Sequence, residues 1–88
     1  MFVVKVYHEK KLVDIAHYRV FQNALADICN KKVFQNIPKE IVDTLGNPEI
    51  RYFSLNNETN TADDFEFCYS NGVMVYLGEI NFTDSLNK

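Results

Sequence analysis

Residues 64–76, DFEFCYSNGVMVY, decide the fold because they form the clearest β-hairpin signal in the chain. Asn71-Gly72 separates two apolar stretches, and Asn-Gly is the preferred pair for a type I′ turn, in which both central residues have positive φ. A two-residue turn at this position predicts three cross-strand pairs: Tyr69–Met74, Phe67–Tyr76 and Phe65–Gly78.

In this register both faces of the predicted hairpin carry apolar side chains. The first face is mainly aromatic and holds Phe65, Phe67, Tyr69, Met74 and Tyr76. The second face is more aliphatic and holds Glu66, Cys68, Ser70, Val73, Val75 and Leu77. Two short helices cover one face of a small sheet and not both. We therefore expect one of these faces to stay exposed, unless the C-terminal segment or the twist of the sheet covers it.

A second hairpin is predicted near the N-terminus. Residues 2–7 (FVVKVY) and 12–18 (LVDIAHY) are rich in β-branched and aromatic residues, with a polar four-residue loop between them. This loop length pairs Tyr7 with Leu12 and Val6 with Val13. Four aliphatic side chains then share the predicted core face: Val4, Val6, Val13 and Ile15. Residues 49–55 (EIRYFSL) predict a further strand.

Helical spacing replaces strand alternation between the two hairpins. Phe21, Leu25, Ile28 and Cys29 follow an i, i+4, i+7, i+8 pattern, which predicts a helix over residues 19–31 without a polar N-cap. A shorter helix is predicted after Pro38, with an apolar stripe formed by Ile41, Val42 and Leu45. Gly46 is expected to end that helix in a left-handed conformation.

The predicted order β-β-α-α-β-β-β defines the fold class as α+β. We expect a five-stranded, mainly antiparallel sheet with two short helices packed on one face. The chain has 88 residues and no linker-like stretch, so a single domain over 1–88 is expected. Residues 56–63 (NNETNTAD) are expected to form a mobile loop, and residues 83–88 a frayed tail.

Composition argues against several classes of function. The formal net charge is −3, and acidic residues dominate residues 47–88, with seven Asp and Glu against two Lys and Arg. A nucleic-acid-binding protein usually has a clustered basic face, so no nucleic-acid partner is expected. No segment is apolar enough to span a membrane, and the N-terminus lacks the features of a signal peptide. We therefore expect a cytoplasmic protein.

Motifs for catalysis, cofactors or metals are absent from the sequence. His8, His17, Cys29 and Cys68 do not have metal-ligand spacing, so we expect no metal, no cofactor and no enzymatic activity. In a reducing compartment the two cysteines are expected to be buried thiols. Four acidic residues near the predicted mobile loop form either a solvated rim or a docking site for a basic partner: Glu58, Asp63, Asp64 and Glu66.

These observations favour a small, non-enzymatic protein-binding module. Its predicted protein-binding residues come from the aromatic hairpin face and the acidic loop: Phe65, Phe67, Tyr69, Met74, Tyr76, Glu58, Asp63 and Asp64. Abundant Asn and the absence of Trp are typical of AT-rich genes, so we expect a phage or mobile-element protein that inhibits or redirects a host protein.

Two alternatives stay open from the sequence. The first is a small homo-oligomeric structural protein, for example a homodimer that packs its sheet faces across a two-fold axis. The second is a small-molecule-binding regulatory domain with a pocket between sheet and helices that uses Tyr7, His17 or Tyr52.

Overall fold

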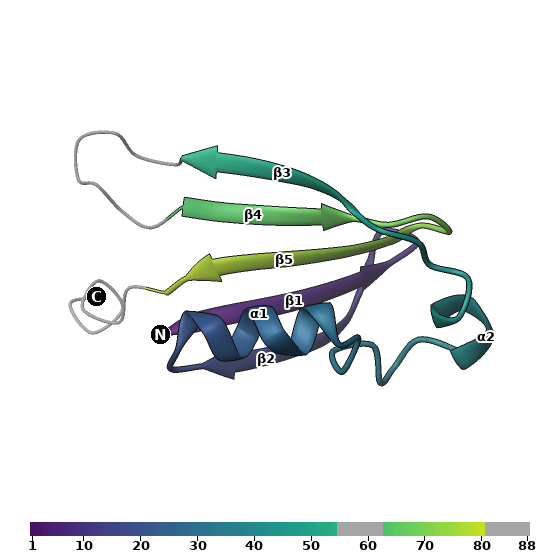
Figure 1. Cartoon of the computed structure of the whole chain (residues 1–88), viewed down its shortest axis with the longest axis horizontal. Coiled ribbons are helices and arrows are strands. Elements are labelled where there is room, and N and C mark those ends of the chain that lie inside the picture. Colours follow the sequence, from purple (N-terminus) through teal and green to yellow (C-terminus); the bar gives the residue numbers. More distant parts are fainter. Residues whose placement is uncertain (55–62, 81–88) are drawn as a thin grey trace.

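The chain folds as a five-stranded antiparallel sheet with two short helices, which confirms the predicted α+β class and order of elements. The computed structural model describes residues 1–54 and 63–80, so the predicted tail and nearly all of the predicted loop lie outside the described residues. The elements are β1 (Phe2–His8), β2 (Lys11–Tyr18), α1 (Phe21–Cys29), α2 (Lys39–Val42), β3 (Glu49–Ser54), β4 (Asp63–Cys68) and β5 (Val73–Glu79). The strand order is β2-β1-β5-β4-β3, so β5 is the middle strand (Figure 1).

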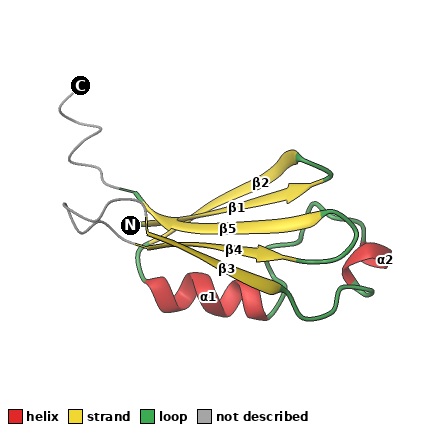
Figure 2. Cartoon of the chain, turned by 90° about the horizontal axis from the view of Figure 1, so that it is seen from above, coloured by secondary structure: helices red, strands yellow, loops and turns green. Residues whose placement is uncertain are grey.

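The two helices lie on the same side of the sheet. α1 runs alongside β1 and β2, and α2 stands beyond the end of the sheet at which both hairpin turns lie (Figures 1 and 2). The face against which the helices pack is called the helix face, and the opposite face the open face. The helix face and the segments that cover it supply the core: Val4, Val6, Ala24, Ile28, Val33, Phe34, Ile37, Leu45, Phe67, Val73, Val75 and Leu77.

The predicted register of the β4–β5 hairpin is wrong by one residue. Phe67 faces Val75, and Cys68 faces Met74. The Asn71-Gly72 turn itself is confirmed, with φ of 61° and 74° for its two residues. Next to the turn, the Val73 N–H donates to the Ser70 carbonyl (3.3 Å), while the Val73 carbonyl accepts from the Tyr69 N–H (2.9 Å). Two residues therefore oppose Val73, which is a β-bulge, and the bulge moves the rest of β4 by one position.

This shift changes which hairpin side chains share a face. Because side chains alternate along a strand, a one-residue slip sends each of them to the opposite face. Phe65 and Phe67 now join the aliphatic residues of β5 on the helix face, and Tyr69 packs against the same core. The open face of the hairpin carries Glu66, Cys68, Met74 and Tyr76. The predicted aromatic face therefore does not exist as a unit.

The β1–β2 register is correct near its turn and wrong beyond it. Tyr7 faces Leu12 as predicted, but the register then shifts and Val6 faces Asp14 in place of Val13. Ile15 consequently faces Lys5 and is 47% exposed, so it is not a core residue. The turn consists of Glu9 and Lys10 alone, both with positive φ (53° and 71°), and is two residues shorter than expected.

Both helices are shorter than predicted. α1 begins after Val20, which makes no side-chain capping hydrogen bond, in line with the missing N-cap signal. Cys29, at the last position of α1, is exposed, so the expectation of a buried thiol is wrong there; Cys68 is partly exposed. Gly46 does not have a positive φ, so it does not end α2 as predicted. Residues 43–45 continue from α2 in tight backbone turns and need no left-handed residue.

Candidate functional site

The open face is organised in rows of side chains that run across the strands. Cross-strand partners define two accessible rows. The turn row consists of Leu12, Tyr7, Met74, Cys68 and Glu49, in the order of the strands. The central row consists of Ile15, Lys5, Tyr76, Glu66 and Arg51. No described helix covers these rows (Figure 2).

Apolar surface on these rows is concentrated over β2, β1 and β5. Leu12 and Ile15 are 51% and 47% exposed, which is high for aliphatic side chains in strands. Tyr7, Met74 and Tyr76 lie beside them and are partly exposed. A hollow of about 460 Å³ includes Tyr7 and Met74 in its lining. Hollows of this kind accept anchoring side chains in protein interfaces.

Charged side chains on the central row have no ionic partner within the described part of the chain. The ion pair found there joins Lys39 to Asp43 on α2 and the residue after it, far from the open face. The Lys5 ammonium lies 5.7 Å from the centroid of the Tyr76 ring. Glu66 is partly buried on the other side of Tyr76. The row therefore places Lys5 on one side of a tyrosine, and Glu66 followed by Arg51 on the other side.

Tyr76 is held in place by its hydroxyl group. The hydroxyl is hydrogen-bonded to Asp64, whose side chain is only 5% exposed. Burial and this carboxylate together raise the pKa of Tyr76 to about 12. A Cβ atom on Gly78 would collide with the Tyr76 hydroxyl and lie 2.7 Å from a carboxylate oxygen of Asp64. The glycine thus gives the tyrosine room to lie along the sheet.

The structure separates the residues that the sequence grouped as a protein-binding surface. Met74 and Tyr76 lie on the open face. Phe67 is buried in the core, while Phe65 and Tyr69 pack against it from the helix face. Asp64 is buried beneath Tyr76 and does not belong to a solvated rim. Glu58 and the side chain of Asp63 lie outside the described residues.

Several open-face residues were not identified from the sequence. The alternation of residues 2–7 already places Lys5 and Tyr7 on one side of their strand. Their neighbours were not predictable, because β1 pairs with β5, which follows it by more than sixty residues. Glu66 was noticed in the sequence as an acidic residue, but it was grouped with the acidic loop and not with Lys5 in a row of the sheet.

A groove on the helix face contains two of the predicted site residues, Phe67 and Tyr69. It measures about 390 Å³ and lies between the end of α1, residues 45–48 and the β3–β4 pair. Ile50 borders it and is 58% exposed. Burial is the main cause that raises the pKa of Tyr69. The groove leaves the β3 side of the helix face only partly covered.

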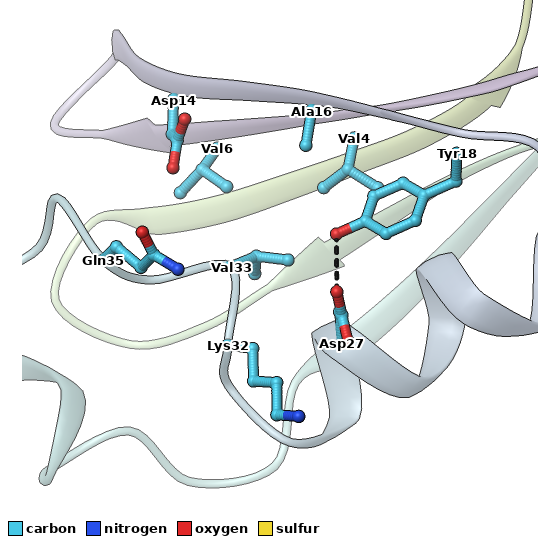
Figure 3. Close-up of a pocket in the computed structure, with 9 residues that line it drawn as sticks. All are labelled: Val4, Val6, Asp14, Ala16, Tyr18, Asp27, Lys32, Val33 and Gln35. Atoms are coloured by element: carbon cyan, nitrogen blue, oxygen red, sulfur yellow. Dashed lines mark hydrogen bonds between the residues drawn. The ribbon is translucent and has the colours of Figure 1, made fainter.

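A smaller pocket of about 280 Å³ lies between the β1–β2 hairpin, α1 and the segment that follows α1 (Figure 3). Its apolar lining comes from Val4, Val6, Ala16 and Val33, and its polar lining from Asp14, Tyr18, Asp27, Lys32 and Gln35. Tyr18 reaches from the sheet towards α1 and donates a hydrogen bond of 2.9 Å to Asp27. Burial, together with this bond, raises the pKa of Tyr18 to about 12.

The pocket predicted from sequence used other residues. Tyr7 and His17 both lie on the open face, where they face Leu12 and Val3, so their assignment to a pocket under the helices is wrong. The side chain of Tyr52 lies outside the described residues. The pocket in Figure 3 instead uses Tyr18, which the bulge in β2 turns towards the helix face.

Within residues 1–54 and 63–80, no group of three or more His, Cys, Asp or Glu side chains is placed to hold a metal ion. In the same residues, no helix is long and apolar enough to cross a membrane.

Comparison with known proteins gives no match: no family model, no curated protein and no solved structure is significantly similar to this chain.

Proposed function

We propose that this chain is a non-enzymatic protein-binding module that acts through its open face. The observation that carries the proposal is the pair of rows described above, in which Leu12, Ile15, Tyr7, Met74 and Tyr76 form an apolar surface outside the core. An exposed apolar patch with a polar border is characteristic of interaction sites. Tyr and Met are also enriched in interfaces relative to the rest of a protein surface.

The proposed surface differs from the one predicted by sequence. It keeps Met74 and Tyr76 and replaces the buried aromatic residues of β4 by Tyr7, Leu12 and Ile15. Partial burial already restricts the motion of Tyr7, Met74 and Tyr76, so less side-chain entropy is lost when they bind. A cytoplasmic location, a phage or mobile-element origin and inhibition of a host protein stay predictions from composition.

Affinity capture with matched variants tests this proposal. The test variant is Leu12→Asp combined with Ile15→Asp, which places charges at two exposed positions of the open face. The control is Ile50→Asp, an exposed strand position on the helix face. We expect a protein captured by wild type to be lost with the test variant and kept by the control. Equal capture by all three, or loss only with Ile50→Asp, would contradict the proposed surface.

A small-molecule-binding domain is the second candidate, and the pocket in Figure 3 is the observation that favours it. Two carboxylates, Asp14 and Asp27, line the pocket together with apolar side chains, and the Lys32 ammonium points away from them in Figure 3, so the pocket suits a small amine with an apolar body. Thermal unfolding in the presence of alkyl monoamines and diamines is the test, because a ligand of the native state raises the melting temperature. If the melting temperature still rises in the Asp27→Asn variant, this pocket is excluded as the binding site. If the melting temperature of the wild type does not rise, this ligand class is excluded.

A further inference from the structure

In the central row of the open face, Lys5 and Glu66 carry opposite charges at equal distances from the middle strand, and Arg51 lies one strand beyond Glu66. Tyr76 lies on β5, Lys5 faces it from β1, and Glu66 faces it from β4. β1 and β4 are the immediate neighbours of β5 on its two sides (Figure 1). Neighbouring strands are about 4.8 Å apart, so the two charged residues are separated by roughly 10 Å of sheet. That separation exceeds the Debye length in physiological salt, which weakens their attraction within one chain.

This arrangement distinguishes between the ways in which two copies can pack face to face. A two-fold axis that runs along β5 exchanges the two sides of the sheet and places Lys5 of one copy opposite Glu66 of the other. An axis that runs across the strands keeps the sides in place, so that Lys5 would meet Lys5 and Glu66 would meet Glu66. Like charges placed opposite each other disfavour an interface, whereas complementary charges fix its register.

We propose that the open face binds a second copy of this chain, with the two-fold axis close to β5 and two reciprocal Lys5–Glu66 pairs. The inference rests on the proposed function, because it uses the same surface and names its partner. A two-fold contact is self-complementary, so each residue pair occurs twice. Packed sheets cross at about 30°, so the axis lies within about 15° of the β5 direction.

The same two-fold operation places the remaining residues of the two rows, including Leu12 of one copy opposite Glu49 of the other. Met74 and Tyr76, both on the middle strand, meet their own counterparts near the axis. At the margins, Ile15 of one copy lies opposite Arg51 of the other, whose aliphatic stem can cover it while the guanidinium group stays in water. Sheets packed face to face are about 10 Å apart, a spacing that side chains of these sizes fill.

The accessible part of the open face limits the strength of the dimer. Beyond the central row, Val3 and Asp64 are only 4% and 5% exposed, while His17 on the edge strand β2 is exposed. Two rows of five side chains and His17 are fewer than the roughly 20–30 residues that each side of a standard interface contributes. We therefore expect a reversible dimer with a dissociation constant in the micromolar range.

Variants that reverse the charge at Lys5 or at Glu66 provide the test. The variants are Lys5→Glu and Glu66→Lys, each checked for folding by circular dichroism, and the readout is sedimentation equilibrium over a range of concentrations. Each variant alone places like charges opposite each other twice, so we expect its dimer to dissociate at least about tenfold more readily than wild type. An equimolar mixture of the two variants restores both pairs, so we expect a heterodimer of near wild-type affinity.

The possible outcomes are distinct. A wild-type dimer that both single variants weaken and their mixture restores supports the inference. A wild-type chain that stays monomeric up to about 1 mM overturns it, since that concentration exceeds a micromolar dissociation constant by orders of magnitude. A dimer that is equally stable in both single variants also overturns it, because the contact then lies elsewhere.

A second measurement covers the case in which a charge variant fails to fold. Met74→Cys, in a chain with Cys29→Ser and Cys68→Ser, places a thiol near the axis, where a short bifunctional maleimide joins two copies. We expect rapid cross-linking at this site and slow cross-linking of the matched Ile50→Cys control, and equal rates would contradict the inference. Failure of self-association leaves the proposed function standing if the open face still captures another protein. Capture is therefore performed at concentrations below the dissociation constant of the dimer.

Discussion

The hydroxyl group of Tyr76 lies against Gly78, two residues further along β5, and is hydrogen-bonded to the buried carboxylate of Asp64. This contact fixes the central side chain of the open face without using a residue of the core. Gly78 faces Val3 in the regular β1–β5 ladder. The contact explains why this strand position is a glycine, because a Cβ atom there would collide with the Tyr76 hydroxyl.

Gly78→Ala is expected to destabilise the protein because its Cβ has no space next to Tyr76 and Asp64. Overpacking of this kind costs about 1–3 kcal/mol of unfolding free energy, measured by chemical denaturation. The matched control is Gly46→Ala, since nothing lies within 4 Å of a Cβ there and the backbone does not have a positive φ. The control is expected to be neutral or stabilising by up to about 1 kcal/mol. Equal effects of the two variants would contradict the contact.

Stability is expected to fall at high pH because of Tyr18 and Tyr76. Each has a pKa raised from 10 to about 12 in the folded chain, mainly through burial and then through its hydrogen-bonded aspartate. The folded state therefore holds these two protons more tightly than the unfolded state. Their contribution to stability is complete below pH 10 and is lost as the pH rises to about 12.

Denaturant unfolding at a series of alkaline pH values measures this loss. In the combined variant Tyr18→Phe and Tyr76→Phe, we expect a shallower decline over this range, with Tyr69, whose pKa is also raised, as a remaining contributor. An unchanged pH dependence would show that these two hydroxyl groups are not involved.

Phe67→Ala is expected to be much more destabilising than Met74→Ala. Phe67 is 5% exposed in the core, and removal of a buried phenylalanine side chain costs about 3–5 kcal/mol of unfolding free energy. Met74 lies on the open face, and its truncation is expected to cost about 1 kcal/mol or less. In the register without the bulge, Phe67 and Met74 would lie on the same face, and the two substitutions would lower the unfolding free energy by similar amounts. Comparable losses of unfolding free energy would therefore argue for that register.

The two cysteines are expected to differ in their reaction with a thiol reagent. Cys29 is exposed at the end of α1, whereas Cys68 is partly buried on the open face. We expect Cys29 to be labelled first, and the Cys29→Ser variant to lose the fast phase. If the inferred dimer forms, labelling of Cys68 slows further as the protein concentration increases. A single labelling rate for both thiols would contradict this difference in exposure.

The sequence by itself determined the local features of this protein. The Asn71-Gly72 turn, the alternation in residues 2–7 and the helical spacing around Phe21 and Ile28 each depend on neighbours within a few positions, so they are readable from one segment. The order of strands and helices, and with it the α+β class, follows from these local features.

Only the tertiary structure decided which residues share a surface. The bulge at Ser70 adds a single residue opposite Val73, and that residue moves Phe65 and Phe67 into the core. The placement of β5 between β1 and β4 brings Lys5, Tyr76 and Glu66 into one row. The bulge and the placement of β5 both depend on how the backbone of one strand pairs with that of another. Because side chains alternate between the two faces of a strand, a one-residue difference in that pairing moves each side chain to the opposite face.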